Sequence, residues 1–172
     1  MSQQDKIKAQ IVEAFKAVPY PGDKGLRGSD EGDEPFMVER EFHGKRDWRS
    51  LQPKFLDQAP EGLGSALSFL SHEAFHYFLP AYLIADLDGL LERVDPVFHL
   101  THGLDNRSCG KGTNPQRYGK KTWNEYACER FEAFSRKEAA AIIEYLRFKL
   151  SLYNDKAVKE ALQNYWEAKG RE

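Results

Sequence analysis

The sequence has few cysteines, little net charge and no long apolar run free of charged residues. Cys109 and Cys128 are its only cysteines, too few for a disulfide scaffold, so we expect free thiols. Charged residues interrupt the most apolar stretch, residues 66–94, which argues against a membrane-spanning helix there. The first residues, MSQQDKIKAQIVEAF, carry charges where an export signal needs an apolar core. We therefore expect a cytoplasmic protein.

A formal net charge of −2 over 172 residues gives no general attraction to nucleic acid or to an acidic membrane. Any partner must therefore be recognised by a local patch of the surface, and we expect that partner to be another protein. Hydrophobic residues at 41% and charged residues at 30% are ordinary for a globular protein. At this length we expect a single domain over residues 1–172.

Apolar residues recur at helical spacing along most of the chain, which predicts an all-α fold. An amphipathic stripe covers residues 4–18, and two further helices are expected at 123–134 and 135–153. A last helix follows, capped by Asn154 or Asp155. We expect one compact bundle of about five to seven helices with at most one or two short strands. Residues 36–42, where apolar and polar side chains alternate, could form a short strand, although so brief an alternation is also compatible with a helix turn.

The longest apolar run, ALSFLSHEAFHYFLPAYLIADLDGLLERV at residues 66–94, is divided by Pro80. Ser71 is a good N-cap for a helix that would start at His72. Pro80 lacks a backbone donor and crowds the preceding turn, so we expect it to kink this helix or to open a second one. The run therefore predicts a buried kinked helix or helical hairpin that continues to about Val94.

Two segments without an apolar periodicity have opposite charge. Residues 22–34, GDKGLRGSDEGDE, are acidic and glycine-rich, which indicates a solvated loop. Residues 102–121, here called the basic loop, contain a single acid, Asp105. The basic side chains of this loop, which are the candidate partner-binding residues, are Arg107, Lys111, Arg117, Lys120 and Lys121. A long loop in a compact domain is often functional, and this one would suit an acidic protein or a phosphate.

One motif could carry chemistry. His72, Glu73 and His76 form the pattern H-E-x-x-H, which on a helix places two imidazoles on one face with a glutamate between them. Such a pair can share a zinc ion while the glutamate takes a proton from a metal-bound water. The site needs a third ligand. The eligible residues downstream of the motif are Glu92, His99 and His102.

The same residues have a simpler interpretation. Ser71 would start the helix at the first ligand and Pro80 would disturb it one turn after the second, whereas a metal site usually rests on an uninterrupted element. His72 and His76 would then be partly exposed residues of a helix surface, and Glu73 an acid favoured in a first helical turn.

The chain resembles a family of uncharacterised bacterial helical proteins, a domain of unknown function. Three stretches carry the resemblance: residues 42–48 (FHGKRDW), residues 66–75 (ALSFLS followed by EAF after one position), and residues 77–83 (YFLPAYL). The family pattern includes Glu73, Phe75, Leu79 and Pro80, whereas the two histidine positions more often hold other residues. The resemblance implies a helical fold and no particular activity.

Two hypotheses follow for function. The first is a non-enzymatic protein-binding domain of the immunity or inhibitor type, without a cofactor, that blocks a partner through its loops. The alternative is a zinc-dependent hydrolase of the metallopeptidase kind, with His72 and His76 as ligands and Glu73 as base. The absence of a coherent catalytic set beyond the motif favours the first.

Overall fold

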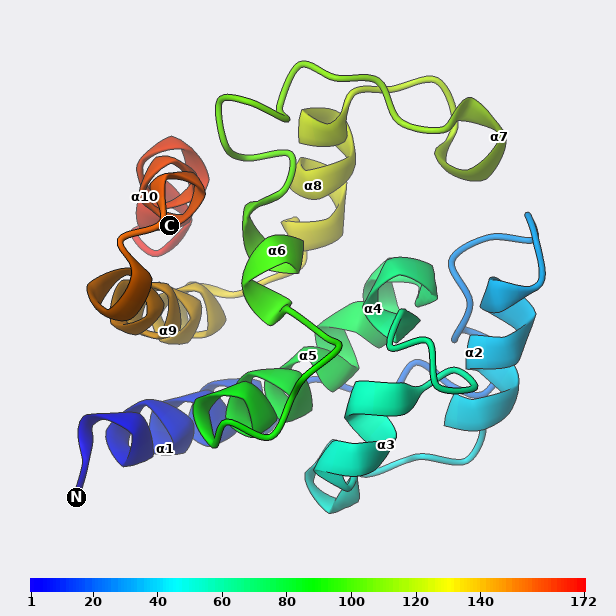
Figure 1. Ribbon diagram of the computed structural model, residues 1–172, viewed down its shortest axis with the longest axis horizontal. Helices are drawn as coiled ribbons and strands as arrows, with labels where there is room; N and C mark the ends of the chain where they lie inside the picture. Colours follow the sequence, from blue (N-terminus) through cyan, green and yellow to red (C-terminus); the bar gives the residue numbers. More distant parts are fainter. The chain divides into compact units, whose positions relative to one another are not determined.

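The computed structural model describes residues 1–172 and is mainly helical (Figure 1). Its elements are α1 (Gln3–Phe15), α2 (Glu34–Phe42), the 3₁₀ turn η1 (Trp48–Ser50), α3 (Pro53–Gln58), α4 (Ala66–Phe69), α5 (His72–Leu87), α6 (Pro96–Thr101), α7 (Pro115–Tyr118), α8 (Trp123–Phe131), α9 (Arg136–Tyr153), α10 (Lys156–Ala161), the π turn η2 (Leu162–Trp166) and α11 (Glu167–Lys169). Its β structure is limited to two isolated bridges, Arg27 with Leu70 and Gly112 with Thr122. The all-α prediction is confirmed. None of the helices is both long and apolar enough to cross a membrane.

The chain forms more helices than the five to seven predicted. Prolines account for much of the difference, because a proline at the first helical positions fixes φ and needs no hydrogen-bond acceptor there. Pro35 and Pro115 each stand at such a position, in α2 and α7, and Pro96 is the first residue of α6; the short helix predicted at Pro53–Gln58 is confirmed as α3. Short segments that lack a long amphipathic pattern are therefore helical.

Residues 36–42, whose alternation allowed a short strand or a helix turn, belong to α2 and are helical. Pro35 is at the start of the helix, and Val38 and Phe42, one turn apart, are buried. Phe36 lies on another face and is largely exposed. The alternation in the sequence matched a strand only because apolar residues occupy two faces of one short helix.

The chain divides into two compact units, one of residues 15–96 and one of residues 1–14 with 97–172. The expectation of one domain over residues 1–172 is untested by this division and stays a prediction.

Helix α5 is the centre of the unit at residues 15–96. It runs without interruption from His72 to Leu87, and eleven of its sixteen residues are buried. Pro80 is inside the helix, so the expected second helix or hairpin is wrong. The helix ends near Gly89, whose positive φ of 70° suits glycine, and does not continue to Val94. Burial on nearly all sides stabilises the helix more than the missing donor of one proline destabilises it.

The acidic segment 22–34 is a loop up to the start of α2 whose residues other than Leu26 are exposed or partly exposed, as predicted, and it is held to this unit. Leu26 is fully buried, and its carbonyl accepts a hydrogen bond from the Ser71 backbone at 2.8 Å. The Ser71 hydroxyl donates to the Gly25 carbonyl at 2.5 Å, while its oxygen caps α5. One apolar side chain among many polar ones is enough to fix the segment, because its backbone pairs with that of residues 69–71.

The carboxylate of Asp23 accepts hydrogen bonds from elsewhere in the same unit. The Gly44 backbone donates to it at 2.9 Å and the Arg46 guanidinium at 3.0 Å, and the Tyr20 hydroxyl also donates. These donors lower the pKa of Asp23, with the Tyr20 hydrogen bond as the largest cause. One carboxylate of the acidic segment 22–34, that of Asp23, thus forms its hydrogen bonds within the fold.

Asp57, at the end of α3, closes the loop that follows α5. Its Oδ1 atom accepts backbone hydrogen bonds from Glu92 and Arg93 at 2.8 Å each, and from Val94 at 3.3 Å. Only 8% of Asp57 is exposed. Burial raises the pKa of this carboxyl, but the three backbone donors and the charge of Arg93 outweigh it, so the pKa lies below its ordinary value.

Helix α9 is the longest element of the unit formed by residues 1–14 and 97–172, and α10, η2 and α11 pack along it. Capping boxes start both α8, at Thr122 and Glu125, and α9, at Ser135 and Glu138 as predicted. Asn154 ends α9 with a left-handed backbone, and Asp155 caps α10.

The π turn η2 carries the largest buried side chain of this unit. Trp166 is fully buried, and its indole N–H donates to the Leu100 carbonyl at 2.8 Å. This bond joins the last helices to the residues that precede the basic loop.

The Asp57 contacts make a first prediction. Asp57→Ala leaves three backbone N–H groups without their acceptor, so we expect a loss of about 2–4 kcal/mol in the free energy of unfolding. Urea denaturation followed by circular dichroism measures it. Gln58→Ala, at an exposed neighbouring position, is the matched control and should change stability by less than about 0.5 kcal/mol. Equal effects of the two substitutions would contradict the role given to Asp57.

Candidate functional site

The H-E-x-x-H residues lie in the first turns of α5. Glu73 is exposed, whereas His72 and His76 are each partly buried. The His76 ring packs edge-on against Phe15, with 6.1 Å between ring centroids and an interplanar angle of 78°. These are the positions expected for residues of a helix surface.

No third ligand joins the motif. Across residues 1–172, no group of three or more His, Cys, Asp or Glu side chains is placed to hold a metal ion. Glu92 is exposed and follows the end of α5, and its backbone N–H donates to Asp57. The side chains present therefore do not fit the zinc site of a metallopeptidase, which needs three protein ligands.

His99 and His102, the other eligible ligands, belong to a cluster of rings in the unit formed by residues 1–14 and 97–172. Burial, followed by the charges of Arg130 and His102, lowers the pKa of His99 to about 3. Burial also lowers the pKa of His102, and Lys111 adds to this while Asp105 opposes it. Both imidazoles therefore favour the neutral form in the fold.

The basic loop is an ordered segment. In Figure 1 it is the long connection between α6 and α8 that carries α7. Its one acid, Asp105, is 7% exposed, and its Oδ1 accepts the backbone N–H groups of Arg107 at 3.0 Å and Ser108 at 3.1 Å. The Ser108 hydroxyl donates to the other carboxylate oxygen and accepts the Gly103 backbone N–H at 2.8 Å.

These bonds hold the pKa of Asp105 below its ordinary value although burial raises it, so the carboxylate stays charged and the turn stays closed. Asp105 was counted in the sequence only as the single acid of the loop. The pattern D-x-x-S was the signal that could have revealed it as an anchor.

Close approach of the backbone fixes the two ends of the loop. A Cβ atom at Gly103 would lie 2.3 Å from the carbonyl oxygen of Trp123, so only glycine fits there, and its φ is +86°. Thr113 pairs with the Lys121 carbonyl through its backbone N–H at 2.9 Å. The Trp123 N–H donates to the Lys111 carbonyl at 2.8 Å. Backbone hydrogen bonds between residues 111–113 and 121–123 thus close the loop beside the start of α8.

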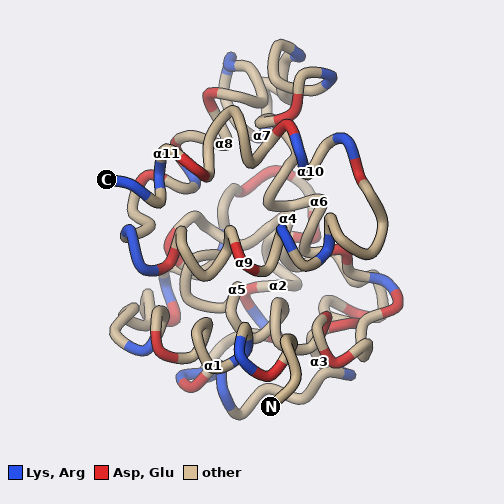
Figure 2. The backbone as a smooth tube through the Cα atoms, turned by 90° about the vertical axis from the view of Figure 1, so that its left-hand side faces the viewer, with Lys and Arg blue, Asp and Glu red and all other residues tan.

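The five basic residues predicted to bind a partner differ in their exposure and in whether they form ion pairs. Lys121 is bound to Glu129 at 2.6 Å, and Arg117 is half-buried. Arg107, Lys111 and Lys120 are exposed and form no ion pair in the structure. Figure 2 shows Lys and Arg positions at the turns beside α7. Three unpaired cations therefore stand on a segment that its own hydrogen bonds hold in place.

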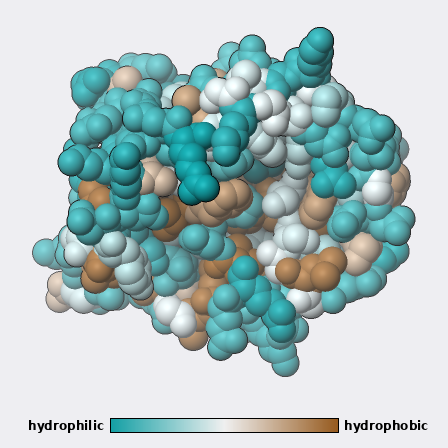
Figure 3. Space-filling view, turned by 45° about the horizontal axis from the view of Figure 1, so that its top comes forward, coloured by the Kyte–Doolittle hydropathy of each residue, from teal (hydrophilic) through white to brown (hydrophobic).

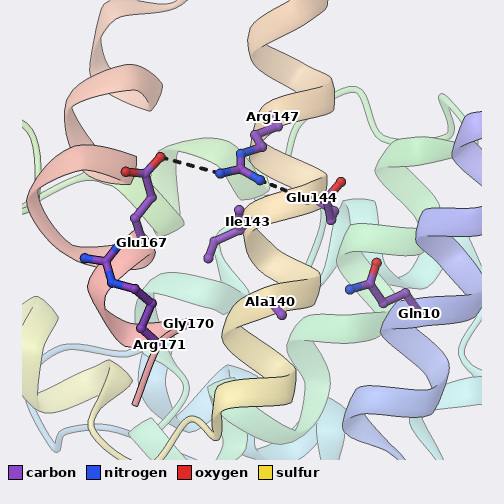
Figure 4. Close-up of a pocket in the computed structure, with 8 residues that line it drawn as sticks. All are labelled: Gln10, Ala140, Ile143, Glu144, Arg147, Glu167, Gly170 and Arg171. Atoms are coloured by element: carbon purple, nitrogen blue, oxygen red, sulfur yellow. Dashed lines mark hydrogen bonds and ion pairs between the residues drawn. The ribbon is translucent and has the colours of Figure 1, made fainter.

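A surface groove of about 370 Å³ lies elsewhere in the same unit, between α9 and α11 (Figure 4). Its floor is formed by Ala140 and Ile143. At its rim the Arg147 guanidinium lies 3.2 Å from Glu144 and 3.6 Å from Glu167, so its charge is already paired. The Arg147–Glu167 pair connects the two helices, whereas the Arg147–Glu144 pair lies within α9.

The fold thus defines a protein of the all-helical class, in which α5 and α9 are the two longest helices. Residues 3–170 match the family of unknown function DUF6714, and the chain belongs to that family. The resemblance to a domain of unknown function is confirmed, while the bacterial origin stays a prediction. No curated protein and no solved structure matches the chain.

The arrangement around α5 predicts the outcome of a metal analysis. Protein purified without an affinity tag should contain well under one zinc per chain by mass spectrometry of the metal, because no set of three ligands forms. His72→Ala should leave that content unchanged. One zinc per chain that disappears in His72→Ala would instead show a metal site at the motif, which the hydrolase alternative requires.

The buried neutral state of His99 predicts a pH dependence of stability. In the unfolded chain this imidazole binds a proton below pH 6.5, whereas in the folded chain it binds one only near pH 3. The free energy of unfolding therefore falls as the pH falls through that window. Between pH 7 and 5 the contribution is up to about 2 kcal/mol. Urea denaturation should show a smaller acid-induced loss for His99→Gln than for the wild type.

The control for this measurement is Gln163→Ala, at an exposed position of the same unit that carries no titratable group. It should keep the pH dependence of the wild type. If His99→Gln retained the full loss between pH 7 and 5, the assignment to His99 would be wrong.

Proposed function

We propose that this chain is a non-enzymatic protein-binding domain whose basic loop, residues 102–121, docks an acidic partner protein. Blocking a partner in the manner of an immunity or inhibitor protein is the action that suits it best. The observation that carries the proposal is the set of three exposed, unpaired cations, Arg107, Lys111 and Lys120, on a segment fixed by internal hydrogen bonds.

The fixed backbone of the loop matters for affinity. A flexible loop would lose conformational entropy on binding, whereas this one is already ordered by the turn at Asp105 and the pairing of Thr113 with Lys121. The cations are therefore presented in a defined arrangement before a partner arrives.

The charge of the loop favours an acidic protein. Its only carboxylate, Asp105, is buried in the turn, so it offers little competition to an external anion. A patch of one sign speeds the encounter with a complementary partner and disfavours wrong ones. Because the net charge of the whole chain is −2, the attraction for an acidic partner comes from this loop and not from the chain as a whole.

The hydrolase hypothesis has less support. Glu73, His72 and His76 are neighbours on α5, but no third ligand is placed with them. The zinc measurement described above separates the two hypotheses without knowledge of a substrate.

Charge reversal tests the proposal. The triple variant Arg107→Glu, Lys111→Glu, Lys120→Glu should lose a partner that co-purifies with the wild type from its native cells at about 0.05 M salt and dissociates at about 0.5 M. The captured protein, identified by mass spectrometry, should be acidic. The control variant Arg136→Glu, Lys137→Glu, Lys159→Glu makes the same charge change at exposed, unpaired positions of the same unit and should retain the partner.

Circular dichroism checks that both variants are folded. Absence of a partner at either salt concentration, or equal capture by the two triple variants, would contradict the docking role of the loop.

A further inference from the structure

We infer that the partner surface extends beyond the cations to an exposed aromatic anchor, Phe98, and that it takes an acidic polypeptide segment carrying aromatic side chains. This inference rests on the proposed function and adds the chemistry of the segment that binds. It follows from how Phe98 is held, from its exposure, and from its position relative to the basic loop.

Phe98 lies at one end of a series of packed rings. Its ring stacks on His102 with centroids 4.8 Å apart and planes 24° from parallel. His102 meets Trp123 edge-on at 4.7 Å. Trp123 in turn contacts Tyr118 at 5.4 Å and Tyr126 at 5.5 Å. The series joins α6 to α7 and α8, so the orientation of Phe98 is set by rings that are themselves partly buried.

Half of Phe98 is nevertheless exposed, at 50%. On the face drawn in Figure 3 the surface is mostly hydrophilic, with hydrophobic atoms in smaller patches. Exposed large hydrophobic side chains occur at few positions in the chain, and among them Phe98 has its ring stacked on a neutral imidazole. A ring already held in one orientation loses little entropy when a second ring packs on it.

The cations border the same series of rings. The backbone of Lys111 is held beside Trp123 by the hydrogen bond from the Trp123 N–H to the Lys111 carbonyl. The charge of Lys111 also contributes to the lowered pKa of His102, which places it near the ring on which Phe98 stacks. The Phe98 ring contacts His102, and the backbone of Lys111 is hydrogen-bonded to that of Trp123, so an aromatic anchor and a residue with an unpaired cation both adjoin the His102–Trp123 ring pair.

This combination specifies the ligand chemistry. Interfaces gain most of their energy from aromatic anchors surrounded by polar contacts, and ring pairs prefer stacked or edge-on arrangements. A segment with alternating carboxylates and aromatic rings matches both features. Single-stranded nucleic acid also combines rings with negative charge, but the chain has a net charge of −2 and only three unpaired cations in the loop, which favours a protein segment.

Synthetic polymers of matched length test the inference on the full chain. The probes are polyglutamate, a random copolymer of glutamate and tyrosine, polylysine and oligothymidylate, with affinities measured by titration calorimetry at low salt. We expect the copolymer to bind about fivefold or more tightly than polyglutamate, and polylysine not to bind. Phe98→Ala should reduce the copolymer affinity to that of polyglutamate and leave polyglutamate binding unchanged.

Phe98→Tyr keeps a ring at this position and should retain the preference for the copolymer. Phe36→Ala removes a phenylalanine of similar exposure, 43%, from α2 and serves as the matched control with wild-type behaviour. Tryptophan emission gives a second readout, because Trp123 is only partly buried whereas Trp48 and Trp166 are buried. Emission should shift with the copolymer in the wild type and less in Phe98→Ala.

The outcomes separate the two proposals. Equal affinity for polyglutamate and the copolymer would overturn the aromatic anchor while the docking function stands. Absence of binding by both acidic polymers would count against the docking function as well. Oligothymidylate binding that is tighter than that of both acidic polymers and is lost in Phe98→Ala would overturn the choice of a polypeptide and identify a nucleic-acid surface.

Discussion

Helix ends leave backbone N–H groups that need acceptors, and a chain made of many short helices has many such ends. Side-chain oxygens meet this requirement at several of the helices. Ser71, Thr122, Ser135 and Asp155 cap helices, while Asp57 and Asp105 accept backbone donors from loops. Carboxylates and hydroxyls therefore provide the acceptors that a neighbouring strand would supply in a sheet protein.

This use of acidic groups has a consequence for the surface. Asp23, Asp57 and Asp105 accept hydrogen bonds within their own units, and each has a pKa below its ordinary value. The basic side chains of loop 102–121 are not matched in the same way, because only Lys121 of the exposed or partly exposed lysines there has a carboxylate partner. The charge balance of the sequence is nearly even, but the free charge on this loop is positive, which is the basis of the proposed docking function.

Local sequence patterns were informative where one signal dominated. The capping box at Ser135 and Glu138 and the long stripe after it gave α9 with nearly correct bounds. Where a segment carried signals for two different structures, burial decided between them, and burial cannot be read from the sequence. Pro80 was expected to kink α5 or to open a second helix, and α5 is continuous through it. The alternation at residues 36–42 allowed a strand or a helix turn, and a proline at the start of the segment together with the burial of Val38 and Phe42 favours the helix.

The sequence alone was sufficient for the helical class, the family resemblance, most helix positions and the location of the basic loop, since these depend on spacing, capping and composition within a few turns of chain. The tertiary structure decided which charges of that loop are unpaired, that the acidic segment is anchored through Leu26, and that Phe98 continues a series of stacked rings. Those features depend on contacts between residues distant in sequence, such as Ser71 with Gly25 or Trp166 with Leu100. A local sequence pattern does not determine which distant residues pair.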